Sequence, residues 1–318
     1  MPYPATDLPH RGLTQLAEQL VLVLYQHRLM TTSQLHRLLQ PHVTTPVYLR
    51  RQLARLRERG LVGSTLRNRG GGQGELAWYC TPGGAEIAEA SGQVRVRAYR
   101  MTEQAAASQL QEHTLAVTET ALAFIAAARL AGHECGPLDW EPELAHRCRD
   151  GEGRIGNEAW LVPDAVLHYV HRTKTRSTFL TYFLELDRAT MHPERLRDKL
   201  SAYARYQTYV PATAGGRGRS GPAPTTEAWR SRYSVFPPVL FVLTGASPTA
   251  LARRTADLRA LAAADSRLRR ASGRLHAGVT TLEQLQAAGP WSPIIVPVFG
   301  DDPVPTDALS YATTTSTR

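Results

Sequence analysis

The hydrophobic period changes partway along the chain, and this change is the strongest constraint on the fold. Up to about residue 131, most apolar residues recur at helical spacing. After residue 138, successive segments instead contain runs of aliphatic and aromatic residues bounded by turn-like sequences. This order predicts a mainly helical amino-terminal part followed by a sheet, which is an α/β fold in the broad sense and α+β in detail.

The length of 318 residues favours two domains, because one hydrophobic core rarely grows past roughly 250 to 300 residues. Hydrophobic residues make up 42% and charged residues 20%, a composition typical of folded chains rather than disordered ones. We place one domain at 1–100 and a second at 101–305, with a mobile Gly/Pro/Ser-rich insertion near 212–234. The remaining segment, 306–318, is expected to be a flexible tail.

The three cysteines are scattered and form no CxxC pair, so neither a disulfide scaffold nor a structural zinc site is expected. The first residues lack a basic stretch followed by an apolar one. No uninterrupted apolar run approaches the roughly 18 residues of a membrane helix. We therefore expect a cytoplasmic protein, with no membrane among its partners.

Positive charge is concentrated at the amino terminus. Residues 1–100 hold thirteen arginines and six acids, which gives +7 of the net charge of +9. A concentrated positive field usually faces a polyanion, most often nucleic acid, although a solvated basic surface would have the same composition.

The amino-terminal third has the element order of a winged helix-turn-helix. Apolar spacing predicts helices near 13–29, 32–40 and 46–59, followed by a hairpin with strands near 61–67 and 75–80. In the third helix, Leu49, Leu53 and Leu56 share one face. Side chains on the opposite face and at its edge, with two more at the glycine-rich hairpin tip, are the predicted DNA-binding residues: Val47, Arg50, Arg51, Arg55, Arg67 and Arg69.

The rest of the chain predicts a helix, three strands, a helix and a strand. The helix covers about 103–131, and the three strands are expected at 138–146, 160–171 and 177–187. A helix near 193–210 and an apolar strand at 237–244 follow, and a basic helix is expected at 249–272. Long apolar strands of this kind indicate a sheet that is covered on both faces.

Acidic residues inside the second and third of these strands carry the predicted chemistry. A hairpin centred on Lys174 and Thr175 would place Asp164 directly opposite Glu185, and Asp187 would point the same way as Glu185. Buried carboxylates need a partner or a cation. We expect the three carboxylates to bind Mg²⁺ or Mn²⁺, which could support phosphodiester hydrolysis.

This pattern, with Pro163-Asp164 and Glu185-Leu186-Asp187, resembles the PD-(D/E)XK nuclease superfamily. The resemblance implies a restriction-endonuclease-like α-β-β-β-α-β domain with catalytic Asp164 and Glu185. Where that superfamily has a lysine, this chain has Asp187. Lys199 on the following helix is a substitute for it or a structural partner of the carboxylates, and Glu119 is a further candidate acid from the first helix.

The chain also resembles the replication-relaxation family. The resemblance rests on the order of short motifs, including LRRQLARLRERGLV, QEHTLAVTE, FLELDRAT, KLSAYARY and PVLFVLT. It implies a bacterial protein of a plasmid or integrated mobile element, acting in replication, DNA relaxation or mobilisation, and associated with the plasmid or nucleoid. Double-stranded DNA is the expected partner.

Two hypotheses for the sheet domain stay open. In the first, the carboxylates and a divalent metal nick or cleave DNA that the amino-terminal domain holds. In the second, the domain has lost catalysis, and the protein is a sequence-specific DNA-binding regulator or initiator. The sheet domain would then serve to form a homodimer or to recruit replication or conjugation proteins. The absent superfamily lysine favours the second hypothesis, and the costly strand carboxylates favour the first.

Overall fold

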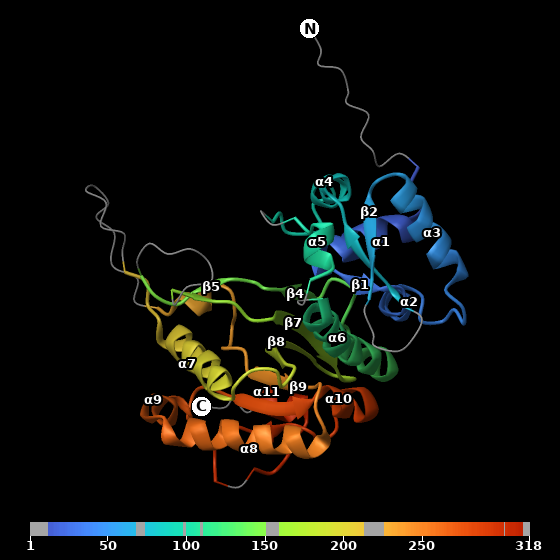
Figure 1. The fold of residues 1–318 in the computed structure, drawn as a ribbon. Helices are drawn as coiled ribbons and strands as arrows, with labels where there is room; N and C mark the ends of the chain where they lie inside the picture. Colours follow the sequence, from blue (N-terminus) through green and yellow to red (C-terminus); the bar gives the residue numbers. More distant parts are fainter. Residues whose placement is uncertain are drawn as a thin grey trace, which may run out of the picture. The chain divides into compact units, whose positions relative to one another are not determined.

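A computed structural model describes residues 12–67, 74–97, 100–108, 111–150, 159–212, 226–301 and 303–313. The fold is mixed α+β, as the sequence predicts (Figure 1). Contacts group the chain into two compact units. Unit 1 contains Met1–Ile125 and Gly136–Leu138, and unit 2 contains Ala126–Cys135 and Asp139–Arg318.

Unit 1 combines helices with a small three-stranded sheet of order β1-β3-β2. Its elements are α1 (Gln15–His27), β1 (Met30–Thr31), α2 (Thr32–Leu39), α3 (Val47–Glu58), β2 (Val62–Leu66), β3 (Leu76–Cys80), α4 (Pro82–Ala90) and α5 (Glu103–Ala106). The three helices and the β2–β3 hairpin follow the predicted order. The sequence did not predict β1, a very short strand that pairs with β3 over only two residues.

Local sequence signals fix the ends of these helices. Thr31 and Gln34 form a reciprocal capping box at the start of α2, which satisfies two backbone donors. Gly60 follows α3 with a φ of 71°, the left-handed conformation in which glycine commonly ends a helix. Pro46 stands at the amino-terminal cap of α3, without a side-chain cap.

Unit 2 is built on a six-stranded sheet of order β11-β10-β9-β8-β7-β4. The long helix α6 (Gln111–Ala131) begins in unit 1 and ends in unit 2. The elements after it are β4 (Trp140–Pro142), β5 (His146–Arg147), β6 (Trp160–Leu161), β7 (Ala165–Arg172), β8 (Ser177–Asp187), α7 (Glu194–Thr208), η1 (Ala228–Ser231), β9 (Val239–Leu243), α8 (Pro248–Ala264), α9 (Ser266–Ala271), β10 (Ala277–Thr281), α10 (Leu282–Ala288), β11 (Val296–Pro297) and α11 (Ala308–Thr313).

The pairing of β7 with β8 confirms the predicted register. Ala165 is opposite Leu184 and Arg172 is opposite Ser177, so the next pair outward is Asp164 and Glu185. β8, β9 and β10 run parallel, whereas β4, β7 and β8 are antiparallel. One face of this sheet packs against α7 and α8, with Val166, Phe183 and Phe241 in its core. Because side chains alternate along a strand, Glu185 and Asp187 share that face with Phe183.

Several predicted elements differ from the observed ones. The predicted strand at 138–146 is two short strands, β4 and β5, and the predicted helix at 103–131 is divided into α5 and α6. The predicted helix at 249–272 is divided into α8 and α9, because the Asp265 side chain caps α9 by accepting hydrogen bonds from the backbone amides of Arg267 and Leu268.

The predicted flexible tail is wrong for residues 308–313, which form α11. The Tyr182 hydroxyl donates to the Ala308 carbonyl oxygen at 2.8 Å, and Tyr311 is buried over the backbone of Gly278. A side chain at position 278 would collide with this packing, so the glycine in β10 allows α11 to dock. The helix is ordered because it is buried against the sheet, and the polar sequence of the tail does not indicate this burial.

Among the described residues, α6 is the only helix that is long and apolar enough to cross a membrane. Of its most apolar window, 56% is buried inside the fold. Phe124 and Ile125 are completely buried, as expected of a core helix.

The last residue of α1, His27, lies in the core of unit 1. Its Nε2 atom is 2.7 Å from the carbonyl oxygen of Pro137, and the side chain is buried. Burial lowers the pKa of His27 to about 3, and the nearby positive charge of Arg97 acts in the same direction. The imidazole is therefore neutral in the folded protein at neutral pH.

We predict that this histidine makes unit 1 acid-sensitive. The folded-state pKa is below the unfolded one, so the stabilisation is present above the unfolded pKa of about 6.5 and is lost as pH falls. Between about pH 7 and pH 5 the loss should be about 2 kcal/mol relative to His27→Gln, which cannot titrate. Denaturant unfolding of both proteins across this range measures the difference, and parallel pH profiles would contradict the prediction.

Candidate functional site

Asp164 and Glu185 meet at one end of the β7–β8 pair, where Lys199 of α7 contacts both. The Lys199 Nζ atom donates to Asp164 Oδ1 at 3.2 Å and to Glu185 Oε2. The side chain of Glu185 is 1% exposed and that of Lys199 is 40% exposed. The cluster therefore combines a buried carboxylate with a lysine side chain that is partly exposed. We call these three residues the carboxylate–lysine cluster.

The remaining carboxylate oxygens of this cluster also have partners. The Tyr203 hydroxyl donates to Glu185 Oε1 at 2.6 Å, and the backbone amide of Leu186 donates to Asp164 Oδ2 at 2.7 Å. Lys199 and Tyr203 are one helical turn apart on α7, so both side chains face the same strand. Sequence reasoning missed Tyr203, although its spacing of one turn from Lys199 is visible in the sequence.

Burial and charge act against each other on the protonation of the cluster. Burial raises the pKa of Glu185 to about 7, although the Lys199 ammonium opposes this shift. For Lys199, burial lowers the pKa, but the charges of Glu185 and Asp164 outweigh it and raise the pKa above its usual value. Lys199 is therefore charged at neutral pH, where Glu185 is partly protonated.

Asp187 does not join the carboxylate–lysine cluster. It lies on the predicted face of β8, but the Arg254 guanidinium of α8 binds both of its carboxylate oxygens, with Nη2 to Oδ1 at 3.1 Å. Two residues along a strand correspond to roughly 7 Å, enough to bring Asp187 under a different helix. Within the described ranges, no group of three or more His, Cys, Asp or Glu side chains could hold a metal ion. The predicted three-carboxylate arrangement is therefore not formed.

Glu119, the candidate acid from the first helix of the predicted nuclease-like core, is held in unit 1. Its Oε1 atom accepts hydrogen bonds from Arg37 at 2.5 Å and from Gln34 at 2.9 Å. These partners are both on α2, so the α6 face that carries Glu119 packs on that helix. Asp164, Glu185 and Lys199 belong to unit 2.

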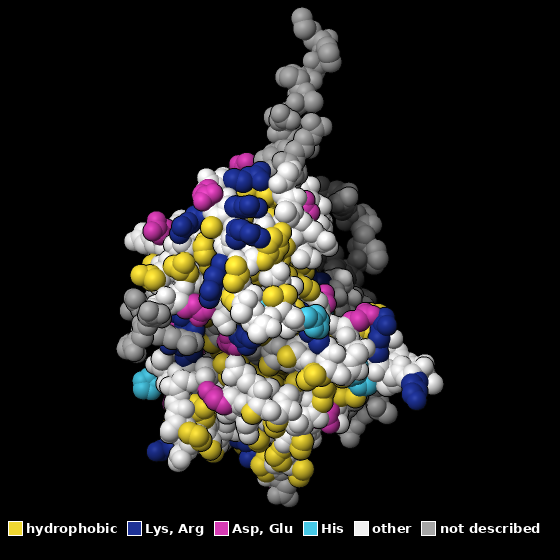
Figure 2. All heavy atoms as spheres, turned by 90° about the vertical axis from the view of Figure 1, so that its right-hand side faces the viewer, with side chains coloured by type: hydrophobic (Ala, Val, Ile, Leu, Met, Phe, Trp, Pro, Cys, Tyr) yellow, Lys and Arg dark blue, Asp and Glu magenta, His cyan; other side chains and the backbone are white. Residues whose placement is uncertain are grey.

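The α3 helix of unit 1 has the two faces that its sequence predicts. Leu49, Leu53 and Leu56 are buried. Val47, Arg50, Arg51 and Arg55 are exposed, and we call these four residues the α3 surface. In the part of the chain that the structure describes, none of these three arginines forms an ion pair, and Arg51 lies over the ring of Tyr48 at 5.2 Å. Figure 2, which faces the side where α3 lies, shows a row of Lys and Arg side chains on the surface.

The hairpin next to α3 differs in part from the prediction. Arg67 forms a bidentate ion pair with Glu112, in which Nε–Oε1 and Nη2–Oε2 are both 2.8 Å. Its guanidinium therefore binds a carboxylate within unit 1, a partner that the sequence did not predict. Arg69 lies outside the described residues. Sequence reasoning missed Arg57, which lies over the Trp78 ring of β3 at 5.9 Å and donates to the Ser64 hydroxyl of β2.

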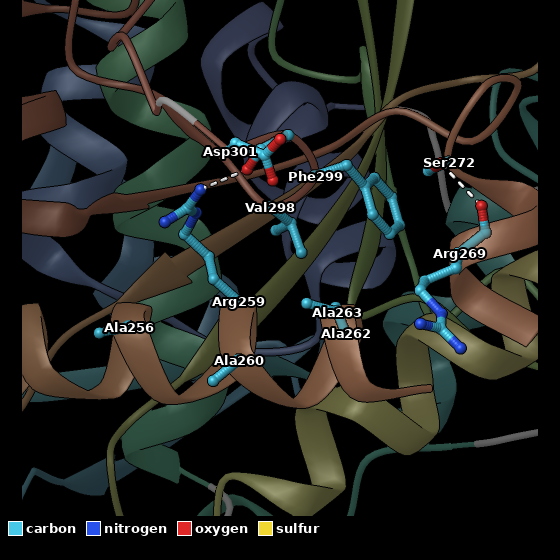
Figure 3. Close-up of a pocket in the computed structure, with 11 residues that line it drawn as sticks. Ala256, Arg259, Ala260, Ala262, Ala263, Arg269, Ser272, Val298, Phe299 and Asp301 are labelled. Carbon is cyan, nitrogen blue, oxygen red and sulfur yellow. Dashed lines mark hydrogen bonds between the residues drawn. The ribbon is translucent and has the colours of Figure 1, made fainter. Parts of the chain in front are cut away.

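A separate pocket of about 400 Å³ lies between α8, α9 and the segment 298–301 (Figure 3). Its floor is formed by alanines of α8 together with Val298 and Phe299. Arg259 points across it and donates to the Pro297 and Gly300 carbonyl oxygens, at 3.0 and 2.7 Å. These hydrogen bonds tie the segment to α8, so Arg259 serves to hold the loop.

We predict that the Asp187–Arg254 pair is needed for stability. Arg254→Met would leave a buried carboxylate without its charged partner, which should lower the free energy of unfolding by about 3 kcal/mol. Arg253→Met changes the exposed neighbour on the same helix and should have little effect. Denaturant unfolding distinguishes the two variants, and equal stabilities would show that the pair contributes nothing.

Comparison with known proteins gives one finding. A family model described as replication-relaxation matches residues 22–217. The match covers α1 from Leu22, the rest of unit 1 and the part of unit 2 that holds the carboxylate–lysine cluster. No curated protein matches the chain, and no solved structure does.

Proposed function

The chain belongs to the replication-relaxation family, and on this basis we propose that it is a DNA-binding protein that acts in the replication or relaxation of a bacterial plasmid or integrated element. In this proposal, unit 1 is a winged helix-turn-helix domain whose α3 helix enters the major groove. The observation that carries the proposal is the α3 surface, where three exposed arginines have no acidic partner among the described residues.

The chemistry of the α3 surface fits DNA better than a protein partner. Arginine pairs with guanine edges through two hydrogen bonds and with phosphates through charge. Val47, at the start of the helix, is 65% exposed and can make an apolar contact with a thymine methyl group. A buried leucine face holds the helix to the unit, so the basic face keeps a fixed orientation.

We expect Arg51→Ala and Arg55→Ala each to weaken duplex binding about tenfold, because each removes a charged contact with a base or a phosphate. Loss of a phosphate contact should also reduce the steepness of the slope of log binding constant against log salt concentration by about 0.9. Arg176→Ala, at the exposed turn between β7 and β8, is the matched control. Fluorescence anisotropy at several salt concentrations provides the measurement. Wild-type affinity in both α3 variants would remove this proposal.

A second candidate function is metal-dependent nicking or cleavage of DNA by unit 2, as in a PD-(D/E)XK nuclease. It is favoured by one observation, the contact of a single lysine with both Asp164 and Glu185. In this role Lys199 replaces the lysine that the superfamily has at the position of Asp187. The alternative, in which unit 2 serves dimerisation or partner recruitment, needs no cation.

The donor chemistry of the cluster suits Mg²⁺ or Mn²⁺, because two neighbouring carboxylates supply hard oxygen ligands. Asp164 and Glu185 would hold the ion, which would supply positive charge at the scissile phosphate. With one ammonium and two carboxylates, the ionised cluster has a net charge of −1 and attracts a cation. Tyr203 holds the Glu185 carboxylate in place.

The test uses supercoiled plasmid that carries the cognate element, with Mn²⁺ or Mg²⁺. We expect nicking that is lost in Asp164→Ala, Glu185→Ala and Lys199→Met but retained in Glu119→Gln, which lies in unit 1. Nicking at low metal concentration should fall as pH falls below about 7, because protons then compete with the cation for Glu185, whose pKa burial raises to about 7 in the metal-free site. Absence of nicking by the wild type, or its survival in Asp164→Ala and Glu185→Ala, would leave the non-catalytic function.

A further inference from the structure

A basic groove lies on unit 2, away from the groups considered so far. It is formed where α7 and α9, which lie side by side in Figure 1, pack against each other. Its volume is about 720 Å³. Its charged lining consists of Arg149, Arg197, Asp198, Arg205, Asp265 and Arg267, and two serines complete it. We call it the α7–α9 groove.

The charges in the groove leave a positive excess. Four arginines face two aspartates, and both acids already have partners. Asp198 pairs with Arg197 at 2.6 Å, and Asp265 accepts hydrogen bonds from backbone amides in the first turn of α9. By contrast, in the part of the chain that the structure describes, Arg205 and Arg267 form no ion pair with a carboxylate. The Arg205 side chain also hydrogen-bonds Cys148, but a guanidinium has five N–H donors, so Arg205 and the exposed Arg267 can both contact an anionic ligand.

The lining indicates which anionic ligand fits. Its side chains are all Arg, Asp or Ser, with no aliphatic or aromatic group among them. Protein interfaces usually require an apolar, desolvated centre, which this groove lacks. Phosphate-backbone contacts use arginine and hydroxyl groups and tolerate a wet, polar surface.

The groove is separate from the carboxylate–lysine cluster. On α7, Arg197, Ser201 and Arg205 lie roughly 160 to 240 degrees around the helix from Lys199. Lys199 faces the sheet, whereas these residues face the groove. An anion in the groove would therefore contact the opposite side of the same helix.

We propose that the α7–α9 groove binds the phosphodiester backbone of DNA, as a contact surface of unit 2 that acts in addition to the α3 surface. This inference rests on the proposed DNA-binding function and extends it to the second unit. Because the groove offers charge and no base-reading side chains of fixed orientation, it contributes affinity that is independent of sequence.

The test compares full-length wild type with the Arg205→Gln/Arg267→Gln double variant on duplex DNA of unrelated sequence. We expect at least about a tenfold loss of affinity and a salt dependence flattened by about 1.8, for two lost phosphate contacts. Arg205→Lys/Arg267→Lys keeps the charge and should retain most of the affinity and the slope. Arg176→Gln, outside the groove, should bind like the wild type. A single strand of the same sequence shows which form of DNA the groove prefers.

Unchanged affinity and slope in the folded Gln double variant would overturn the inference. If that variant does not fold, equal binding by the Lys double variant and a single Arg267→Glu variant would overturn it instead. Arg51→Ala and Arg55→Ala, measured on the same DNA, separate this outcome from failure of the proposed function. Loss in the α3 variants alone refutes only the groove, and loss in the groove variants alone refutes only the assignment of α3.

Discussion

The burial of Glu185 is the constraint on which the structure of unit 2 depends. A carboxylate that is 1% exposed, near the end of a central strand of the sheet, is tolerated only with charged or hydrogen-bonding partners. Lys199 and Tyr203 supply these partners from one face of α7. Since both must reach the same carboxylate, the rotation and position of α7 over β7 and β8 are fixed. The apolar residues of α7, Leu196 and Leu200, then pack in the same core.

Asp187 imposes the same requirement on the next helix. Its partner, Arg254, comes from α8, so two acids on one strand select two different helices. A buried ion pair does little to increase stability over an apolar pair, but it penalises any arrangement that separates the charges. Both pairs lie on one face of the sheet, and they favour one placement of α7 and α8 over the alternatives that apolar packing alone would allow. The acids that suggested a metal site thus have a structural role in the fold as well.

The sequence predicted local and pairwise features well and long-range partners poorly. The register of β7 and β8 followed from a two-residue turn and the cost of isolating Asp164 and Glu185, and the faces of α3 followed from the helical period. The ion-pair partners could not be predicted in this way. Glu112, the partner of Arg67, is 45 residues away in sequence, and Arg254, the partner of Asp187, is 67 residues away. β10, β11 and α11 were also missed. They are short, and their order comes from neighbours such as β9 and Tyr182 rather than from their own periodicity.

The sign of the charge differs among the α3 surface, the α7–α9 groove and the carboxylate–lysine cluster, and it decides what each can attract. The α3 surface and the α7–α9 groove carry positive charge without acidic neutralisation of their key arginines, so they can attract a phosphate backbone. The ionised carboxylate–lysine cluster is net negative and repels a phosphate. A cluster of that sign can contribute to phosphodiester chemistry only after a cation reverses its charge, and protonation of Glu185 near neutral pH would oppose binding of the cation. In the proposed function, the arginines therefore attract the DNA, and any chemistry at the cluster would depend on metal concentration and pH independently of DNA affinity.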